Sequence, residues 1–219
     1  MFHQSIVDLI NDEQKITLLT KEILDNGFIR VADFFDTPTL EALHTIARDP
    51  QFQNKKDGQL AGTIVAEVGY SDGILELSQK FHDARCKLTG ETRVVLDKSK
   101  QAIGMPYKNA ANETNIETSY HYDGAYINLL FALQMPEKTE IGNGNLILFP
   151  SLRRSYTPGI AKIVSRILRH FKIARKIYGY KEVMYQVDAM HIFFGDISFH
   201  GVEPIKSGER VVVTINSHW

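Results

Sequence analysis

Residues 191–216 read HIFFGDISFHGVEPIKSGERVVVTIN and contain the clearest structural pattern in the chain. Three short runs in this stretch are rich in aromatic or β-branched residues: His191–Phe194, Ser198–Val202 and Arg210–Asn216. Turn-forming pairs separate the runs, namely Gly195-Asp196 and Ser207-Gly208. Short runs of this composition, bounded by glycine turns, predict β-strands.

The same pattern extends back to Gly90. Further strands are predicted at Thr92–Asp97, Ala102–Lys108, Ile116–His121, Ile127–Met135, Asn145–Phe149 and Lys181–Val187. Before Gly90 the apolar residues recur at helical spacing and predict helices over 5–26, 37–48 and 72–89. A series of short strands after a helical front favours a mainly β fold of the jelly-roll kind, in which the helices cover the outer face of one sheet.

Length and composition agree with this prediction. The 219 residues suit one domain, with a helical support region at 1–90 and a β core at 91–219. One cysteine excludes an intrachain disulfide and favours a cytoplasmic protein. The sequence has no apolar run long enough for a membrane span, and its first residues lack the pattern of a secretory signal.

Three residues in the predicted β core have the chemistry of metal ligands. His121 and Asp123 are two residues apart, so on a strand both side chains lie on the same face. His200 lies on another predicted strand. Two imidazoles and one carboxylate can occupy one face of an octahedral metal and leave three positions open, as in non-haem Fe(II) oxygenases.

Arg210 adds a second chemical feature. It follows His200 by ten residues, across a turn and at the start of a strand, so it can point into the same cavity. The planar guanidinium of an arginine suits a carboxylate, and a dicarboxylate is the expected ligand.

With these residues in place, the sequence resembles the iron(II)/2-oxoglutarate-dependent oxygenases, including their prolyl-hydroxylase-like and phytanoyl-type branches. The matching segments cover most of the chain: 26–34 (NGFIRVADF), 121–124 (HYDG), 144–150 (GNLILFP) and 191–210. The resemblance implies a double-stranded β-helix, which is a cupin-like jelly roll. It also implies Fe(II), 2-oxoglutarate and dioxygen as cofactor and co-substrates.

The resemblance assigns individual roles. His121, Asp123 and His200 would bind iron, and Arg210 would bind the distal carboxylate of 2-oxoglutarate. Halogenating members of the family have a small residue in place of the carboxylate, so Asp123 favours oxygen transfer over chlorination.

Four further residues are candidates for the pocket that holds the co-substrate. Tyr107 can hydrogen-bond 2-oxoglutarate or can be an ordinary strand tyrosine. Asn128, or Tyr126 beside it, can line the pocket. The family often has Ser or Thr two residues after the arginine, but this sequence has Val212 there, so Thr214 is the candidate substitute.

A basic amphipathic helix is predicted at about 157–179, inserted between two strands. Residues 141–181 contain nine Lys or Arg and no acidic residue, so the rest of the chain carries a net charge of −10 against a total of −1. Two interpretations remain open. The helix packs its apolar stripe on the barrel with a solvated basic face, or it flanks the mouth of the site and meets an anionic ligand or a membrane surface.

The function predicted from these features is hydroxylation of an unactivated C–H bond in a small, anionic or lipid-like molecule. Two alternatives remain: an oxygenase acting on a protein side chain or a carrier-bound substrate, and a cupin-like metal-binding module without enzymatic activity. A nucleic-acid substrate is disfavoured because the net charge is near zero and no aromatic residues alternate with the basic ones. The sequence does not indicate an oligomeric state.

Overall fold

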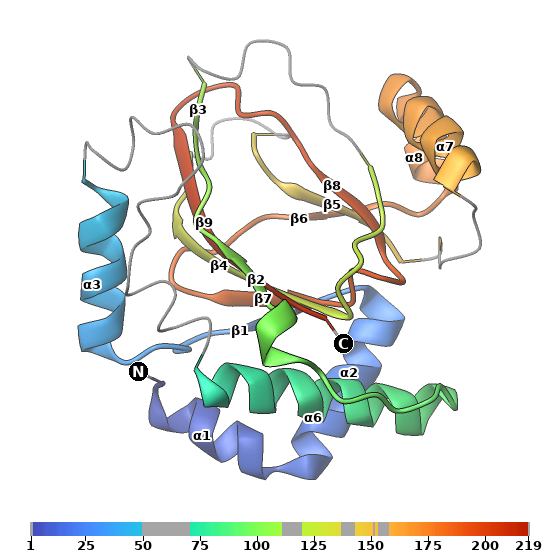
Figure 1. Ribbon diagram of the computed structural model, residues 1–219. Helices are drawn as coiled ribbons and strands as arrows, with labels where there is room; N and C mark the ends of the chain where they lie inside the picture. Colours follow the sequence, from blue (N-terminus) through green and yellow to red (C-terminus); the bar gives the residue numbers. More distant parts are fainter. Residues whose placement is uncertain are drawn as a thin grey trace.

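A computed structural model describes residues 2–49, 71–110, 120–136, 143–150, 152 and 158–218 (Figure 1). Its helices are α1 (Gln4–Asn11), α2 (Glu13–Asn26), α3 (Thr37–Ala47), α6 (Asp72–Thr89), α7 (Pro158–His170) and α8 (Lys172–Ile177), with a 3-10 turn η1 (Lys98–Lys100). Its strands are β1 (Ile29–Val31), β2 (Ala102–Gly104), β3 (Tyr107–Asn109), β4 (Ile127–Gln134), β5 (Leu146–Phe149), β6 (Lys181–Val183), β7 (Met190–Phe193), β8 (Phe199–Val202) and β9 (Glu209–Ser217). No described helix is both long enough and apolar enough to cross a bilayer.

The strands form two antiparallel sheets. The larger sheet has the order β1-β7-β4-β9-β2, and β3 also pairs with β9. The smaller sheet has the order β6-β5-β8. Two predicted strands differ from this arrangement: Thr92–Asp97 is not a strand, and Ala102–Lys108 is divided into β2 and β3. Most of the predicted strand at Ile116–His121 lies outside the described residues.

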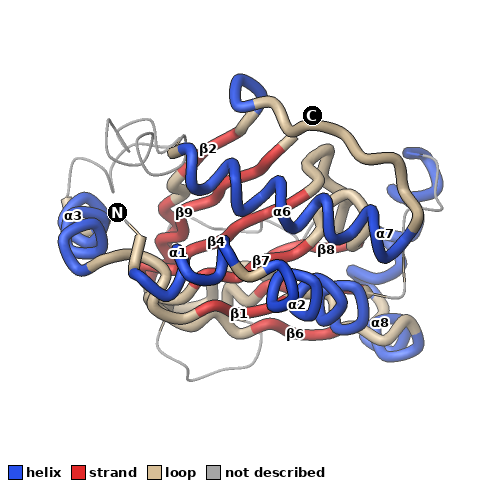
Figure 2. Tube along the Cα trace, turned by 90° about the horizontal axis from the view of Figure 1, so that it is seen from below, coloured by secondary structure: helices blue, strands red, loops and turns tan. Residues whose placement is uncertain are grey.

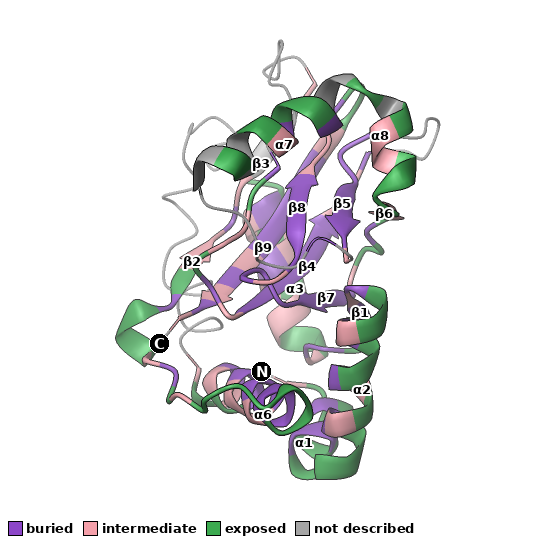
Figure 3. Cartoon of the chain, turned by 90° about the vertical axis from the view of Figure 1, so that its right-hand side faces the viewer, coloured by how far each residue is buried: buried purple, intermediate pink, exposed green. Residues whose placement is uncertain are grey.

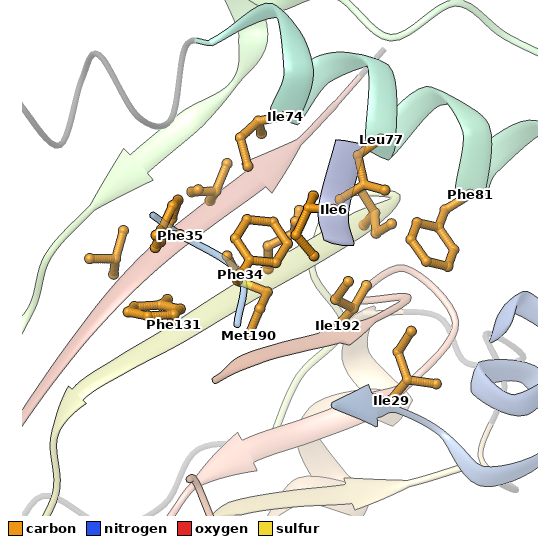
Figure 4. Packing of buried hydrophobic residues seen from close by; sticks show 14 of the residues in the cluster. Ile6, Ile29, Phe34, Phe35, Ile74, Leu77, Phe81, Phe131, Met190 and Ile192 are labelled. Atoms are coloured by element: carbon orange, nitrogen blue, oxygen red, sulfur yellow. The ribbon is translucent and has the colours of Figure 1, made fainter. Parts of the chain in front are cut away.

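The helical layer covers the outer face of the larger sheet, as predicted. Figure 2 shows α1, α2 and α6 lying across this sheet. Alternate residues of β9, namely Val211, Val213 and Ile215, belong to the buried cluster that also contains Leu77 and Phe81 of α6. Figure 4 shows how closely the helix and strand side chains of this cluster pack. Its burial is the main source of hydrophobic stabilisation in the fold.

A second cluster lies between the sheets. Val212 of β9 and Phe193 of β7 pack with Leu146 and Leu148 of β5. Because side chains alternate along a strand, the even-numbered residues of β9 face the smaller sheet and the odd-numbered ones face the helices. The space between the sheets is therefore where inward-facing polar side chains can meet.

The inserted segment covers the outer face of the smaller sheet. Leu168 of α7 is buried with Ile147, Phe149 and Phe199. The sequence pattern predicted one helix here, but the chain forms two, because the backbone at Phe171 is extended and begins α8.

The first predicted helix, 5–26, is also divided in two. Asp12 has an extended backbone, and its side chain accepts a hydrogen bond from the backbone N–H of Lys15. It ends α1 and caps α2, which lets both short helices direct apolar residues at the same sheet. Gly27 ends α2 in the left-handed conformation at φ 92°, as the Asn26-Gly27 pair predicts.

The buried imidazole of His191 should make stability depend on pH. Burial lowers the pKa of His191 to about 4, and Arg30 opposite it acts in the same direction. An unfolded histidine titrates near 6.5, so the unfolded state takes up the proton first. This contribution to stability is complete above about pH 6.5 and is lost as the pH falls toward about 4, by up to about 1.4 kcal/mol per pH unit.

Urea unfolding at about pH 7, 6 and 5 measures this loss as a decrease in the free energy of unfolding. His191→Gln, which keeps a hydrogen-bond acceptor, should show a shallower decrease than the wild type. Equal slopes in the two proteins would contradict the assignment to His191, because all other titrating groups are common to both.

Candidate metal centre

His121 and His200 are joined through their backbones. The N–H of each residue donates to the carbonyl of the other, at 2.8 and 2.9 Å, which forms an isolated antiparallel bridge. This bridge adds the His121 segment to the β8 edge of the smaller sheet. The two imidazole rings lie side by side, with their centroids 4.6 Å apart.

Asp123, two residues after His121, is held by the turn that follows β7 of the larger sheet. Its backbone N–H donates to the carbonyl of Gly195, the second residue after β7, at 2.9 Å. Its carboxylate oxygens lie 3.3 Å from Nε2 of His121 and 3.3 Å from Nε2 of His200. One ligand atom from each of the three residues lies within 4.8 Å of the others.

The donor set fits a divalent metal ion. Ligand atoms about 2.1 Å from one metal and at right angles to each other lie about 3 Å apart, close to the separations seen here. Nδ1 of His200 lies 2.9 Å from the carbonyl oxygen of Ser198, to which it can donate. That hydrogen bond leaves Nε2 of His200 as the lone-pair nitrogen directed at the site.

Asn128 holds the carboxylate in place. Its side-chain amide in β4 donates to Asp123 Oδ2 and, at 3.1 Å, to Asn216 Oδ1 in β9. Burial works to raise the pKa of the Asp123 carboxyl, but hydrogen bonding with His121 and His200 outweighs it and keeps that pKa well below its usual range. Asp123 is therefore an anion at neutral pH, as a metal ligand must be.

No family model matches the sequence, and no curated protein matches it either. Solved structures do match. A prolyl 4-hydroxylase from Phytophthora capsici is 16% identical with a TM-score of 0.60, over 100% of this chain and 66% of that one. The epimerase SnoN from nogalamycin biosynthesis, in complex with Fe3+, alpha-ketoglutarate and nogalamycin RO, is 11% identical with a TM-score of 0.61, over 94% and 84%.

A third similar structure is a prolyl hydroxylase from Trichoplax adhaerens in complex with a hypoxia-inducible-factor peptide. It is 14% identical with a TM-score of 0.53, over 96% of this chain and 92% of that one. The chain therefore shares its fold with these prolyl hydroxylases and with SnoN. The chain spans about two thirds of the Phytophthora protein and most of the other two.

Arg210 of β9 extends from the larger sheet toward the smaller one. Its side chain is buried, and Nη1 donates to the carbonyl of Gly144, just before β5, at 3.1 Å. Tyr185 belongs to the cluster between the sheets and lies close enough to Arg210 for the positive charge of the guanidinium to affect its pKa. Burial raises the pKa of Tyr185 to about 12 although Arg210 opposes the rise. The phenol of Tyr185 is therefore neutral at this position. The sequence analysis did not identify this residue.

The other predicted positions have different surroundings. Thr214 donates its hydroxyl to the carbonyl of Gly104 at 3.2 Å. Tyr126 packs against His82 and Arg85 of α6, so it contacts the helical layer. Tyr107 pairs with Val211, while Lys108 is the residue opposite Arg210. The side chain of Tyr107 lies outside the described part of the chain.

Gly195 is a site residue that the sequence analysis treated only as a turn. A Cβ atom there would come within 2.9 Å of both Asp123 Cβ and Asn128 Cγ. Since Cβ atoms essentially never approach so closely, only glycine lets the turn lie against the side chains of Asp123 and Asn128.

Gly195→Ala should therefore displace Asp123 and weaken Fe(II) binding by about 10- to 100-fold, the usual effect of disturbing groups that orient a metal ligand. Gly124→Ala is the matched control, because its Cβ would make only an ordinary contact, 3.7 Å from His218. Anaerobic Fe(II) titration, with circular dichroism to verify folding, measures both. Equal affinities in the two variants would show that the close contact at Gly195 is unimportant.

Proposed function

We propose that the protein is an Fe(II)/2-oxoglutarate-dependent oxygenase whose two sheets form a double-stranded β-helix. The observation that carries the proposal is the meeting of His121 and Asp123 from one segment with His200 from another. The hydrogen bond from His200 to Ser198 supports it, because it orients the imidazole before any metal binds.

Arg210 and Tyr185 are proposed to hold the distal carboxylate of 2-oxoglutarate. Arg210 supplies a buried guanidinium between the sheets, where a carboxylate would gain a charge-assisted hydrogen bond. Tyr185 supplies a neutral phenol in the same buried cluster as Val212, which stands where the family often has Ser or Thr. A phenol that stays protonated to about pH 12 can donate to the same carboxylate.

The chain's own residues control access to the metal. Bound iron with 2-oxoglutarate would use dioxygen to oxidise a substrate C–H bond, with release of succinate and CO2. The side chain of His200 is only 6% exposed, whereas that of His121 is 52% exposed. The substrate therefore approaches from the His121 side, while Phe193 packs against His200 and keeps the opposite side apolar.

Hydroxylation of a small, anionic or lipid-like molecule is the favoured reaction. The similar structures include an epimerase and a hydroxylase in complex with a peptide, so stereochemical inversion and a protein substrate are the alternatives to test. Succinate release, measured over a panel of small molecules and of peptides, separates these classes. Metal binding without any succinate release would favour the cupin-like binding module instead.

We expect one Fe(II) per chain. His121→Ala and His200→Ala should each abolish iron binding, because two remaining ligands no longer define one face of the metal. His44→Ala is the control, since His44 pairs with Asp188 away from the site. Iron content after anaerobic loading and desalting measures occupancy, and wild-type occupancy in either ligand variant would refute the assignment.

We expect Arg210→Ala to weaken 2-oxoglutarate binding by roughly 10- to 100-fold, because a charge-assisted hydrogen bond contributes about 1.5–3 kcal/mol. Arg210→Lys should recover only part of the affinity, since an ammonium lacks the planar fork. Tyr185→Phe should weaken 2-oxoglutarate binding by roughly 2- to 10-fold, the effect of losing one neutral hydrogen bond. The visible charge-transfer band of the anaerobic Fe(II) complex reports binding, and unchanged affinity in Arg210→Ala would exclude this carboxylate site.

A further inference from the structure

The two helices inserted between β5 and β6 leave several large apolar side chains in solvent. Figure 3 shows α7 and α8 on the outside of the smaller sheet, with much of their described surface exposed. Ile163, Ile173 and Ile177 expose 62%, 75% and 77% of their surface. Ile160, Ile167 and Phe171 are exposed as well. A cluster of this kind is uncommon on a protein surface unless something covers it.

The exposed residues differ from those that attach the helices to the sheet. Leu168 is buried against the sheet, and the hydroxyl of Ser165 accepts the backbone N–H of Tyr120 at 3.1 Å. In α8, Arg175 forms an ion pair with Glu203 at 3.2 Å. These contacts fix the rotation of the helices and direct the isoleucines away from the barrel. Of the two open interpretations, packing of the apolar stripe on the barrel therefore accounts for Leu168 but not for the exposed isoleucines.

The exposed residues form a regular surface. Ile160, Ile163 and Ile167 recur at helical spacing on one side of α7, and Ile173 and Ile177 are one turn apart on α8. Arg166 and Lys176 are exposed on the same two helices. We call the surface made by these seven residues the insert surface. It combines two exposed basic side chains with apolar side chains that reach into solvent.

We infer that the insert surface binds the face of an anionic lipid bilayer. Helices that lie in the plane of a membrane interface combine an apolar side with Lys and Arg, and they bind anionic lipid most strongly. Residues 141–181 carry nine basic and no acidic residues, while the rest of the chain has a net charge of −10. An anionic surface would attract the insert and repel the remainder, which orients the molecule with the insert toward the lipid.

The charge distribution favours a bilayer over a second copy of the chain. A symmetric dimer through the insert surface would bring two segments of the same positive sign together, and like charges across an interface oppose association. A bilayer has no such repulsion, and its interface accepts side chains to a depth of about 5–10 Å. Isoleucines that project from short helices reach this depth without any change in the barrel.

Binding of the insert surface to a bilayer would also position the candidate metal centre. Ser165 is hydrogen bonded to Tyr120, the residue before His121, and His121 is on the open side of the candidate metal centre. A chain bound through the insert surface would hold that opening close to the lipid interface. The binding itself requires neither iron nor 2-oxoglutarate, so it can be tested apart from the proposed oxygenase activity.

Vesicle flotation of the full chain, without iron or 2-oxoglutarate, tests the inference. The probes are vesicles of phosphatidylcholine alone and vesicles with about 30% phosphatidylglycerol. The apolar variant combines Ile163→Ser, Ile173→Ser and Ile177→Ser. Its control combines Leu18→Ser, Leu88→Ser and Val95→Ser, three exposed apolar residues elsewhere on the chain. The charge variant is Arg166→Glu with Lys176→Glu, and its control is Lys15→Glu with Lys87→Glu.

The wild type and both controls should float with anionic vesicles, and binding should weaken at about 0.5 M salt. The apolar and the charge variants should each bind about 10-fold more weakly or worse, with unchanged melting temperatures. Equal flotation with neutral vesicles, no flotation of the wild type, or full binding by the apolar variant would overturn the inference. It would also fall if light scattering shows a wild-type dimer that the apolar variant converts to a monomer, because a second copy would then cover the surface.

Discussion

A buried ion pair connects the helical layer to the candidate metal centre. Arg85 of α6 donates to both carboxylate oxygens of Asp196, at 2.7 and 2.9 Å, and both side chains are buried. The rings of Tyr126 and Phe194 flank the guanidinium of Arg85. The more exposed carboxylate of Glu91 forms a second ion pair with it. Removal of Arg85 would leave the Asp196 carboxylate buried without this partner, at a cost of about 3–5 kcal/mol.

The ion pair matters because of the turn in which Asp196 lies. Within four residues this turn supplies the Gly195 carbonyl that accepts the N–H of Asp123 and the Ser198 carbonyl that orients His200. Two of the three candidate ligands therefore take their positions from one turn, and a helix more than a hundred residues earlier holds that turn in place. The candidate metal centre, which strands and turns largely form, thus depends on the helical layer behind it.

Much of the fold was predictable because it rests on local patterns. The ends of α6 and of β4, β5 and β8 follow from apolar periodicity and from glycine, and the spacing of His121 and Asp123 is visible in the sequence.

What the sequence could not show depends on partners far away along the chain. Thr92–Asp97 has β-type composition but no neighbouring strand to pair with among the described residues. The contacts of Arg85 with Asp196 and of Gly195 with Asn128 join distant segments and leave no local signal. Periodicity likewise revealed the apolar stripe of the insert but not which half of it the sheet would bury.

The segment that carries His121 separates the candidate metal ligands from the contacts with the insert. Because neighbouring side chains point to opposite faces, His121 faces the metal side, while Tyr120 and Tyr122 face the cluster under the insert. Tyr120 is buried there, and the hydroxyl of Tyr122 donates to the carbonyl of Leu152 at 2.8 Å. The hydrogen bond between Tyr120 and Ser165 uses a backbone N–H, and the one between Tyr122 and Leu152 uses a phenol that points away from the site, so neither involves a candidate ligand atom. Changes in α7 and α8 can therefore alter what approaches the opening while His121, Asp123 and His200 keep their mutual geometry.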